Sequence, residues 1–522
     1  MIDYLIRNGS VIDGGGAGPA MLNIGITDDL VSFIGTEEPA AGTVIDANGL
    51  FVAPGFIDTH AHSEFTLLAD GRAEGKLSQG VTTEINGNCG LSAAPLLGEA
   101  LERREVDMKE LDIEERWSTF EEYFEILQRK GIALNFATLC GQGNIRASVM
   151  GYRNGLPTNT EMAEMKRLLS DALQAGTKGL STGLIYPPGV YSSPEEIAEL
   201  AGMLSESPAG IYASHMRSEG DGLIEAIQET LKIGRESGAP VHISHIKTSG
   251  EHNWHKIDSV VSLIEEAIAS GLRVTCDRYP YIASSTDLDT VVPAWVYEGG
   301  VEEELRRLKD PAIRSKISSD LAPKDDAYWK SVYVSSAVKA ENKWMEGESI
   351  FEIAAKVGRH PAEAVLDIII EEKARAGAIF FSMCEENLRR FLALPYTMIG
   401  SDSSVRSFSG TTRSGKPHPR GFGSFPRFIG RYVRDEKLLD LPQAIRRITS
   451  MPAGIFGIER RGFIRKGFYA DLVIFDYDAI RDDADFRDPF RISQGIVHVF
   501  VNGKISFSGG KFTGARAGMV LQ

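Results

Sequence analysis

The segment Gly55-Phe56-Ile57-Asp58-Thr59-His60-Ala61-His62 joins a short apolar run to two histidines spaced two residues apart. Successive side chains of a β-strand point to opposite faces, so His60 and His62 share one face. Two imidazoles on one face can bind the same metal ion, although an isolated pair is equally compatible with a structural role. The segment therefore predicts a strand that presents two metal ligands at its carboxyl end.

Further apolar runs of similar length follow, and amphipathic helical patterns over 158–176, 223–237 and 258–270 lie between some of them. This alternation is typical of parallel βα units. A ninth run, Ile379–Met383, also resembles a strand, so the count stays open. Eight strands would close a (β/α)8 TIM-like barrel. The eight are Phe56–His62, Thr82–Asn86, Asn135–Leu139, Gly179–Gly183, Ile211–His215, Val241–His245, Val274–Tyr279 and Thr397–Asp402.

Both ends of the chain contain short strand patterns with turn signals such as Asn8-Gly9 and Asn502-Gly503. We expect one small β-sandwich domain formed from both termini. A charged stretch with Trp329 and Trp344 fits no βα unit and predicts a lid-like insertion. The expected division is β-sandwich at 1–52 and 458–522, catalytic barrel at 53–285 and 351–457, and insertion at 286–350.

The composition limits the partners and the compartment. The 522 residues include 72 acidic and 56 basic side chains, a net charge of −16, which disfavours nucleic acid and anionic membranes as partners. The first residues lack a signal-peptide pattern, and no apolar run approaches the roughly 18 residues of a membrane span. The four cysteines form no C-x-x-C pair. We expect a cytoplasmic protein with free thiols, and a homo-oligomer is compatible with the sequence.

Four of the ten histidines fall at carboxyl ends of predicted strands, where barrel enzymes place their active sites. His215 and His245 end neighbouring strands, whereas His242 points to the opposite face and is expected to be structural. A lone strand-end histidine is usually structural, but the whole set is hard to explain in that way. Asp402 ends the last strand and can bind a metal.

Asp402 can also exchange a proton with metal-bound water, whose pKa zinc lowers to about 7. Hydrolysis of an amide needs a group that takes this proton and returns it to the leaving nitrogen. We predict that Asp402 is this general base and acid.

Two cysteines are placed alike after predicted strands. Cys89 follows the second strand and Cys140 the third. A free cysteine is usually buried filler, and a thiolate near a cation is the alternative. Position alone does not choose between the two residues.

The sequence resembles the N-acyl-D-amino-acid deacylases (D-aminoacylases) of the amidohydrolase superfamily over essentially its whole length. The strand-end histidines and Asp402 follow the superfamily pattern, and several local motifs resemble those of the deacylases. These are Gly87-Asn88-Cys89-Gly90, Ser181-Thr182-Gly183-Leu184-Ile185-Tyr186-Pro187-Pro188-Gly189, His215-Met216-Arg217-Ser218-Glu219-Gly220, Ile243-Ser244-His245-Ile246-Lys247, Arg278-Tyr279-Pro280-Tyr281, Gly400-Ser401-Asp402-Ser403, His418-Pro419-Arg420 and Ala470-Asp471-Leu472-Val473.

The resemblance implies zinc-dependent hydrolysis of an N-acyl-D-amino acid to a carboxylate and a free D-amino acid. It implies one tight zinc held by Cys89, His215 and His245. It also implies a second, weaker position framed by His60, His62 and Asp402.

Two alternatives to this reading are weaker. A cyclic amidase of the hydantoinase or dihydroorotase kind would be expected to carry a bridging lysine inside the fourth strand, 179–183, which has none. A non-catalytic binding barrel would not need every one of the expected ligands. We therefore keep the linear amidase as the main hypothesis.

Substrate capture is predicted from charge. An N-acyl amino acid carries a carboxylate that favours an arginine or a lysine. Arg278 lies at the end of the seventh strand beside Tyr279, and Lys247 lies two residues after His245 and shares its face. The resemblance adds Tyr186 and Ser285. The apolar stretch 291–295 after the seventh strand favours hydrophobic substrate side chains.

Overall fold

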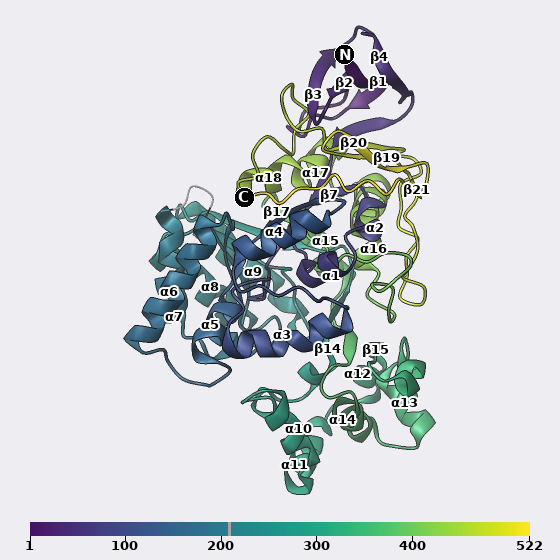
Figure 1. Ribbon diagram of the computed structural model, residues 1–522. Helices are drawn as coiled ribbons and strands as arrows, with labels where there is room; N and C mark the ends of the chain where they lie inside the picture. Colours follow the sequence, from purple (N-terminus) through teal and green to yellow (C-terminus); the bar gives the residue numbers. More distant parts are fainter. Residues whose placement is uncertain (207–209) are drawn as a thin grey trace.

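The computed structural model describes residues 1–206 and 210–522, and a closed barrel of parallel strands lies at its centre (Figure 1). All eight predicted strands are present, and hydrogen bonds close the ring: Asp402 N donates to His60 O at 2.7 Å and Lys178 N to Thr138 O at 2.8 Å. The barrel strands are β6 (Phe56–Asp58), β7 (Val81–Asn86), β8 (Asn135–Thr138) with its short continuation β9 (Cys140–Gly141), β10 (Gly179–Gly183), β11 (Ile211–His215), β12 (Val241–Ile243), β13 (Val274–Arg278) and β17 (Thr397–Ile399).

Amphipathic helices pack around the barrel, and the three predicted helices are α6, α8 and α9. Their buried faces join the main hydrophobic cluster of the barrel. The helices of this layer are α1 (Glu64–Ala69), α2 (Glu74–Leu77), α3 (Gly98–Glu110), α4 (Phe120–Lys130), α5 (Gln142–Met150), α6 (Asn159–Gln174), α7 (Pro194–Ala201), α8 (Leu223–Ser237), α9 (Ile257–Ala269), α15 (Glu385–Ala393), α16 (Arg420–Arg427), α17 (Leu441–Arg447) and α18 (Ser450–Ile455). In the described ranges, no helix is both long enough and apolar enough to cross a membrane.

The two ends of the chain form the β-sandwich domain together, as predicted (Figure 1). β5 pairs with both β1 and β18, which joins the amino-terminal and carboxyl-terminal strands in one nine-stranded sheet. Its strands are β1 (Ile2–Val11), β2 (Ala20–Thr27), β3 (Leu30–Gly35), β4 (Ala41–Asp46), β5 (Phe51–Pro54), β18 (Leu472–Phe475), β19 (Ile496–Val501), β20 (Lys504–Ser508) and β21 (Lys511–Phe512).

The insertion has its own sheet and its own hydrophobic core. The ninth predicted strand is β16, which pairs with β14 and β15 outside the barrel. Buried residues from Leu288 to Ala378 form this core, so the packed unit extends past the predicted 286–350. We propose 283–381 for it. Its elements are β14 (Ala283–Asp287), α10 (Val301–Lys309), α11 (Pro311–Leu321), α12 (Asp326–Lys330), β15 (Val332–Ser336), α13 (Ile350–Val357), α14 (Pro361–Glu371) and β16 (Gly377–Phe381).

A fully buried lysine forms ion pairs beside the carboxyl ends of the first and last barrel strands. Lys76 Nζ lies 2.6 Å from Asp58 Oδ2 and 2.6 Å from Glu84 Oε1, and none of the three side chains is exposed. Removing the lysine would leave two carboxylates buried without their cation. We expect Lys76→Met to destabilise the protein by about 3–5 kcal/mol, measured as a lower urea midpoint.

The matched control is Lys130→Met, which breaks the partly exposed pair of Lys130 with Glu115. Exposed pairs contribute about 0–1 kcal/mol, so its midpoint should stay near that of the wild type. Equal midpoints for the two variants would contradict the prediction.

Candidate metal centre and active site

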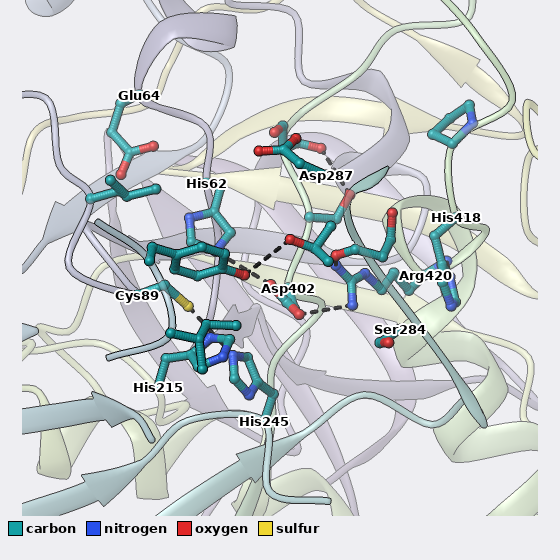
Figure 2. Close-up of a pocket in the computed structure, with 18 of the residues that line it drawn as sticks. His62, Glu64, Cys89, His215, His245, Ser284, Asp287, Asp402, His418 and Arg420 are labelled. Carbon is teal, nitrogen blue, oxygen red and sulfur yellow. Dashed lines mark hydrogen bonds and ion pairs between the residues drawn. The ribbon is translucent and has the colours of Figure 1, made fainter. Parts of the chain in front are cut away.

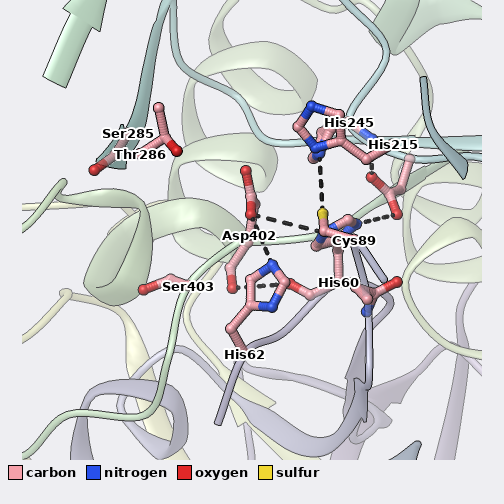
Figure 3. A network of polar contacts seen from close by, with 12 residues as sticks. His60, His62, Cys89, His215, His245, Ser285, Thr286, Asp402 and Ser403 are labelled. Atoms are coloured by element: carbon pink, nitrogen blue, oxygen red, sulfur yellow. Dashed lines mark hydrogen bonds and ion pairs between the residues drawn. The ribbon is translucent and has the colours of Figure 1, made fainter. Parts of the chain in front are cut away.

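Six predicted metal ligands meet at the carboxyl ends of the barrel strands (Figures 2 and 3). Most of the strands end earlier than predicted. The ligands lie on the turns that follow them, except for His215, which is the last residue of β11. The φ angles of Cys89, His245 and Asp402 are 55°, 36° and 51°, in the left-handed region that non-glycine residues seldom adopt. Such strain costs about 1–3 kcal/mol and is common at active sites. These turns, rather than strand alternation, direct the three side chains into the site.

Cys89 lies among the histidines. Its Sγ is 3.3 Å from His60 Nε2 and 3.4 Å from His245 Nε2. Burial alone would raise the pKa of the thiol, but the neighbouring imidazolium charges hold this pKa well below its usual value. Cys140 is instead packed in the hydrophobic core, where burial raises its pKa. The structure therefore brings Cys89, and not Cys140, to the histidines.

A buried carboxylate that the sequence analysis missed orients the site. Asp277 is unexposed, and its Oδ2 lies 3.1 Å from His60 Nδ1 and 2.8 Å from His242 Nε2. Although burial opposes ionisation, these partners lower the pKa of Asp277. His242 also contacts Thr275, which confirms its structural role. Because Asp277 fixes the imidazole of His60, the free Nε2 atom faces Cys89.

Asp402 lies between the histidines and an arginine. Its Oδ1 is 3.3 Å from His62 Nε2, and its Oδ2 is 2.8 Å from Arg420 Nη1. Burial would raise the pKa of this carboxyl, but Arg420 and His62 hold it well below its usual range. Asp402 is therefore an ionised carboxylate that can accept a proton.

Glu219 is a second carboxylate that the sequence analysis missed. Glu219 lies four residues after His215, and this short separation is the only indication in the sequence that it belongs to the site. Glu219 Oε1 is 2.9 Å from His245 Nδ1 and also pairs with Lys247 Nζ, which is 2.8 Å from the same imidazole nitrogen. His245 is thus held from behind, with Nε2 facing Cys89.

The donors fit a metal ion. Both ring nitrogens of His215 are buried and lack a hydrogen-bond partner among the described residues, which is costly unless a ligand binds them. Thiolate, imidazole and carboxylate together suit zinc. Three groups have donor atoms within 4.8 Å of one another: His60, Cys89 and His245; His60, His62 and Asp402; and His215, Glu219 and His245. The second group matches the predicted weaker position. The residues of the predicted tight position are divided between the first group, which contains Cys89 and His245, and the third, which contains His215 and His245.

A cavity of about 500 Å³ opens over these donors (Figure 2). Four of the five predicted substrate contacts, Tyr186, Lys247, Tyr279 and Ser285, line it. Tyr186 OH lies 3.1 Å from Thr286 Oγ1, and Ser285 Oγ donates to Ala378 O at 2.9 Å. Tyr279 OH is buried and has no hydrogen-bond partner in the described ranges.

The prediction for Arg278 differs from the structure. Its side chain is 1% exposed, donates to Tyr281 O and Met383 Sδ, and is not among the residues that line the cavity. Alternation along β13 explains this, because Asp277 points to the site and Arg278 therefore points away. Arg420, from the quoted His418-Pro419-Arg420 motif, lines the cavity instead, with its guanidinium 4.6 Å from the Tyr279 ring centre.

The structure also does not support the prediction that the enzyme prefers substrates with hydrophobic side chains. Val291 and Val292 are buried in the core of the insertion, and the stretch 291–295 does not line the cavity. The apolar character of this stretch therefore reflects packing rather than substrate recognition.

A barrel with a thiolate, four imidazoles and an ionised carboxylate at its carboxyl face defines a metal-dependent hydrolase. The chain belongs to the amidohydrolase family, whose family model matches residues 43–507.

Characterised relatives cover nearly the full chain. It is 36% identical to a D-aminoacylase of Alcaligenes xylosoxydans xylosoxydans, over 99% of this chain and 97% of that protein. The chain is also similar to a solved structure of an N-acyl-D-glutamate deacylase from Bordetella bronchiseptica, complexed with zinc and a phosphonate inhibitor. The TM-score is 0.84 and the identity 32%, and the match covers 100% of this chain and 99% of that one. A D-hydantoinase matches with a TM-score of 0.56, 15% identity and coverage of 100% and 98%, which shows the shared fold alone.

Proposed function

We propose that this chain hydrolyses the amide bond of N-acyl-D-amino acids, giving a carboxylate and a free D-amino acid. One observation carries the proposal: the ionised Asp402 lies beside the cysteine–histidine donors, on the floor of a cavity that fits a small molecule. The relatives described above are a D-aminoacylase and an N-acyl-D-glutamate deacylase, and their names support the same substrate class. The fourth barrel strand, Gly179–Gly183, contains no lysine, which supports a linear amidase over a cyclic one.

We assign the tight metal position to Cys89, His215 and His245, and a weaker one to His60, His62 and Asp402. The unpaired nitrogens of His215 and the low pKa of Cys89 support the first set. When bound, a divalent metal such as zinc polarises the amide carbonyl and lowers the pKa of a bound water.

Asp402 performs the proton transfers in this proposal. One of its carboxylate oxygens accepts a proton from the attacking water and then returns it to the leaving amide nitrogen. Arg420 keeps the carboxylate ionised before attack, because its charge lowers the pKa of Asp402. Release of the protonated amine completes the reaction.

We place the substrate carboxylate at the cavity wall formed by Lys247, Tyr279 and Arg420. The two cations lie over the Tyr279 ring, at 5.9 Å for Lys247 and 4.6 Å for Arg420, and the phenol OH is buried without a partner. An incoming carboxylate would accept hydrogen bonds from this hydroxyl and from the cations. These local donors would bind the carboxylate on a chain whose net charge is −16.

We expect Tyr279→Phe to raise KM by about tenfold or more, because the variant loses a buried hydrogen bond to a charged group, while kcat changes less. Steady-state kinetics with N-acetyl-D-methionine measure both constants. The matched control is Tyr281→Phe, since Tyr281 OH is 3.2 Å from Asp482 and does not line the cavity. Equal KM values for the two variants would remove Tyr279 from substrate binding.

The proposed function is tested by a turnover panel of N-acetyl-D- and N-acetyl-L-amino acids and a hydantoin, with metal content measured on the same sample. We expect turnover of D-substrates only. Turnover of the hydantoin alone would favour the cyclic amidase. A metal-loaded protein that is inert toward every D-substrate would refute the proposal.

A further inference from the structure

A second, smaller cavity of about 50 Å³ adjoins the active-site cavity and shares a wall with it. The shared wall contains residues of α3, of the loop after β10 and of β14. The remaining wall comes from the insertion, at the start of α10. The shared residues are Arg103, Ile185, Tyr186, Pro187 and Asp287, and the others are Asp289, Thr290, Tyr297, Gly300, Val301 and Glu304.

Three carboxylates line this second cavity: Asp287, Asp289 and Glu304. Asp287 lies in the shared wall, so the acidic side is reached from the active site. Glu304 is only 1% exposed, and its Oε1 is buried with no hydrogen-bond partner in the described part of the chain. A buried carboxylate oxygen without a partner is costly to maintain. Its position in the cavity wall points to a ligand that supplies the partner.

Within the described ranges, no cation of the protein forms an ion pair with these three carboxyl groups, and burial disfavours their charged form. Arg103 lines the same cavity, and its charge partly offsets the rise in the pKa of the three carboxyl groups, but within the described ranges it forms no ion pair with them. Arg307, one turn after Glu304, donates instead to the carbonyl oxygens of Val296 and Glu298. Burial and mutual repulsion raise the pKa of Asp289 to about 7 and that of Glu304 to about 8.

The arrangement suits an organic cation better than a metal ion. Among the described residues, the groups with three donors within 4.8 Å of one another are all in the metal centre, so these carboxylates are too dispersed to share one ion. Tyr186 and Tyr297 line the same cavity and can pack against an aliphatic stem. An ammonium or guanidinium group at the end of this stem would then bind the carboxylates of the same cavity.

We propose that Asp287, Asp289 and Glu304 form a subsite for a cationic group of the substrate, distal to the scissile amide. This inference rests on the proposed function and narrows its substrate class. The cation is carried either by a basic D-amino-acid side chain or by an acyl group that ends in an amine.

Two substrate pairs distinguish these sources. N-acetyl-D-lysine is compared with N-acetyl-D-norleucine, and 6-aminohexanoyl-D-leucine with hexanoyl-D-leucine, each by kcat/KM on metal-loaded enzyme. We expect the charged member of one pair to exceed its neutral partner by about tenfold or more, as for a desolvated charge pair. The pair that shows this preference identifies where the cation is carried.

Glu304→Gln should bring that ratio close to one, because the amide cannot form an ion pair with the cationic group. The matched control is Glu302→Gln, the same change on an exposed residue of α10, which should keep the wild-type ratio. If Glu304→Gln does not fold, Asp289→Asn decides in its place, with the same expected loss. A wild-type ratio of one or less in both pairs, or a ratio that the folded variant retains, overturns the subsite. If no N-acyl-D-amino acid is hydrolysed at all, both the proposed function and the subsite are refuted. Turnover of neutral substrates without a preference for the charged ones refutes the subsite alone.

Discussion

Asp402→Asn is expected to lower kcat/KM for an N-acetyl-D-amino acid by roughly 10³-fold. The amide of asparagine has nearly the shape of the carboxylate but cannot accept the proton of the attacking water. The loss should fall mainly on kcat, because the wall of Lys247, Tyr279 and Arg420 is unchanged. Steady-state kinetics and metal analysis of the same preparation give the test.

The variant should keep its tight metal, since the proposed ligands of that position do not include Asp402. Asp320→Asn is the control, because it makes the same change on an exposed residue of α11. A folded, metal-loaded Asp402→Asn enzyme with a rate within tenfold of the wild type would remove Asp402 from the mechanism.

Cys89→Ala is expected to weaken metal binding by at least about 100-fold, because loss of even an indirect contact to a metal ligand costs 10–100-fold. The Sγ atom lies within 3.4 Å of two imidazoles and is held as a thiolate by their charges. Alanine removes this anionic donor. Metal content after dialysis against a weak chelator, together with activity, measures the effect.

Cys140→Ala is the matched control for this experiment. Cys140 is also buried, but it lies in the hydrophobic core and the pKa of its thiol is raised. Its replacement should lower stability through a small cavity while leaving the metal content unchanged. Retention of full metal by Cys89→Ala, or its loss in Cys140→Ala, would reverse the assignment.

Much of the fold could be predicted because it depends on local patterns. The eight barrel strands and helices α6, α8 and α9 follow from hydrophobic periodicity. The limits of the insertion could not be predicted in this way. β16 has the same apolar pattern as a barrel strand, and only its pairing with β14 and β15 separates the two.

The candidate site was predictable where residue type and position coincide. His60, His62, His215, His245 and Asp402 combine a metal-binding chemistry with a place at a strand end. Their partners lacked such a signal. Asp277 is a single acidic residue within a strand. Arg420 pairs with Asp402 although it lies 18 positions further along the chain, at the start of α16.

The sequence by itself predicted the barrel, the joining of both termini in one domain and a set of candidate metal-binding side chains. These depend on strand periodicity, on composition and on the chemistry of histidine and aspartate, which are local properties. Only the tertiary structure replaced Arg278 by Arg420 in the cavity and assembled the acidic subsite around Glu304. It also supplied the contacts that agree with Cys89, which the family resemblance implies, over Cys140. The physical reason is that burial, ion pairing and side-chain direction at a turn depend on neighbours that are distant in the chain.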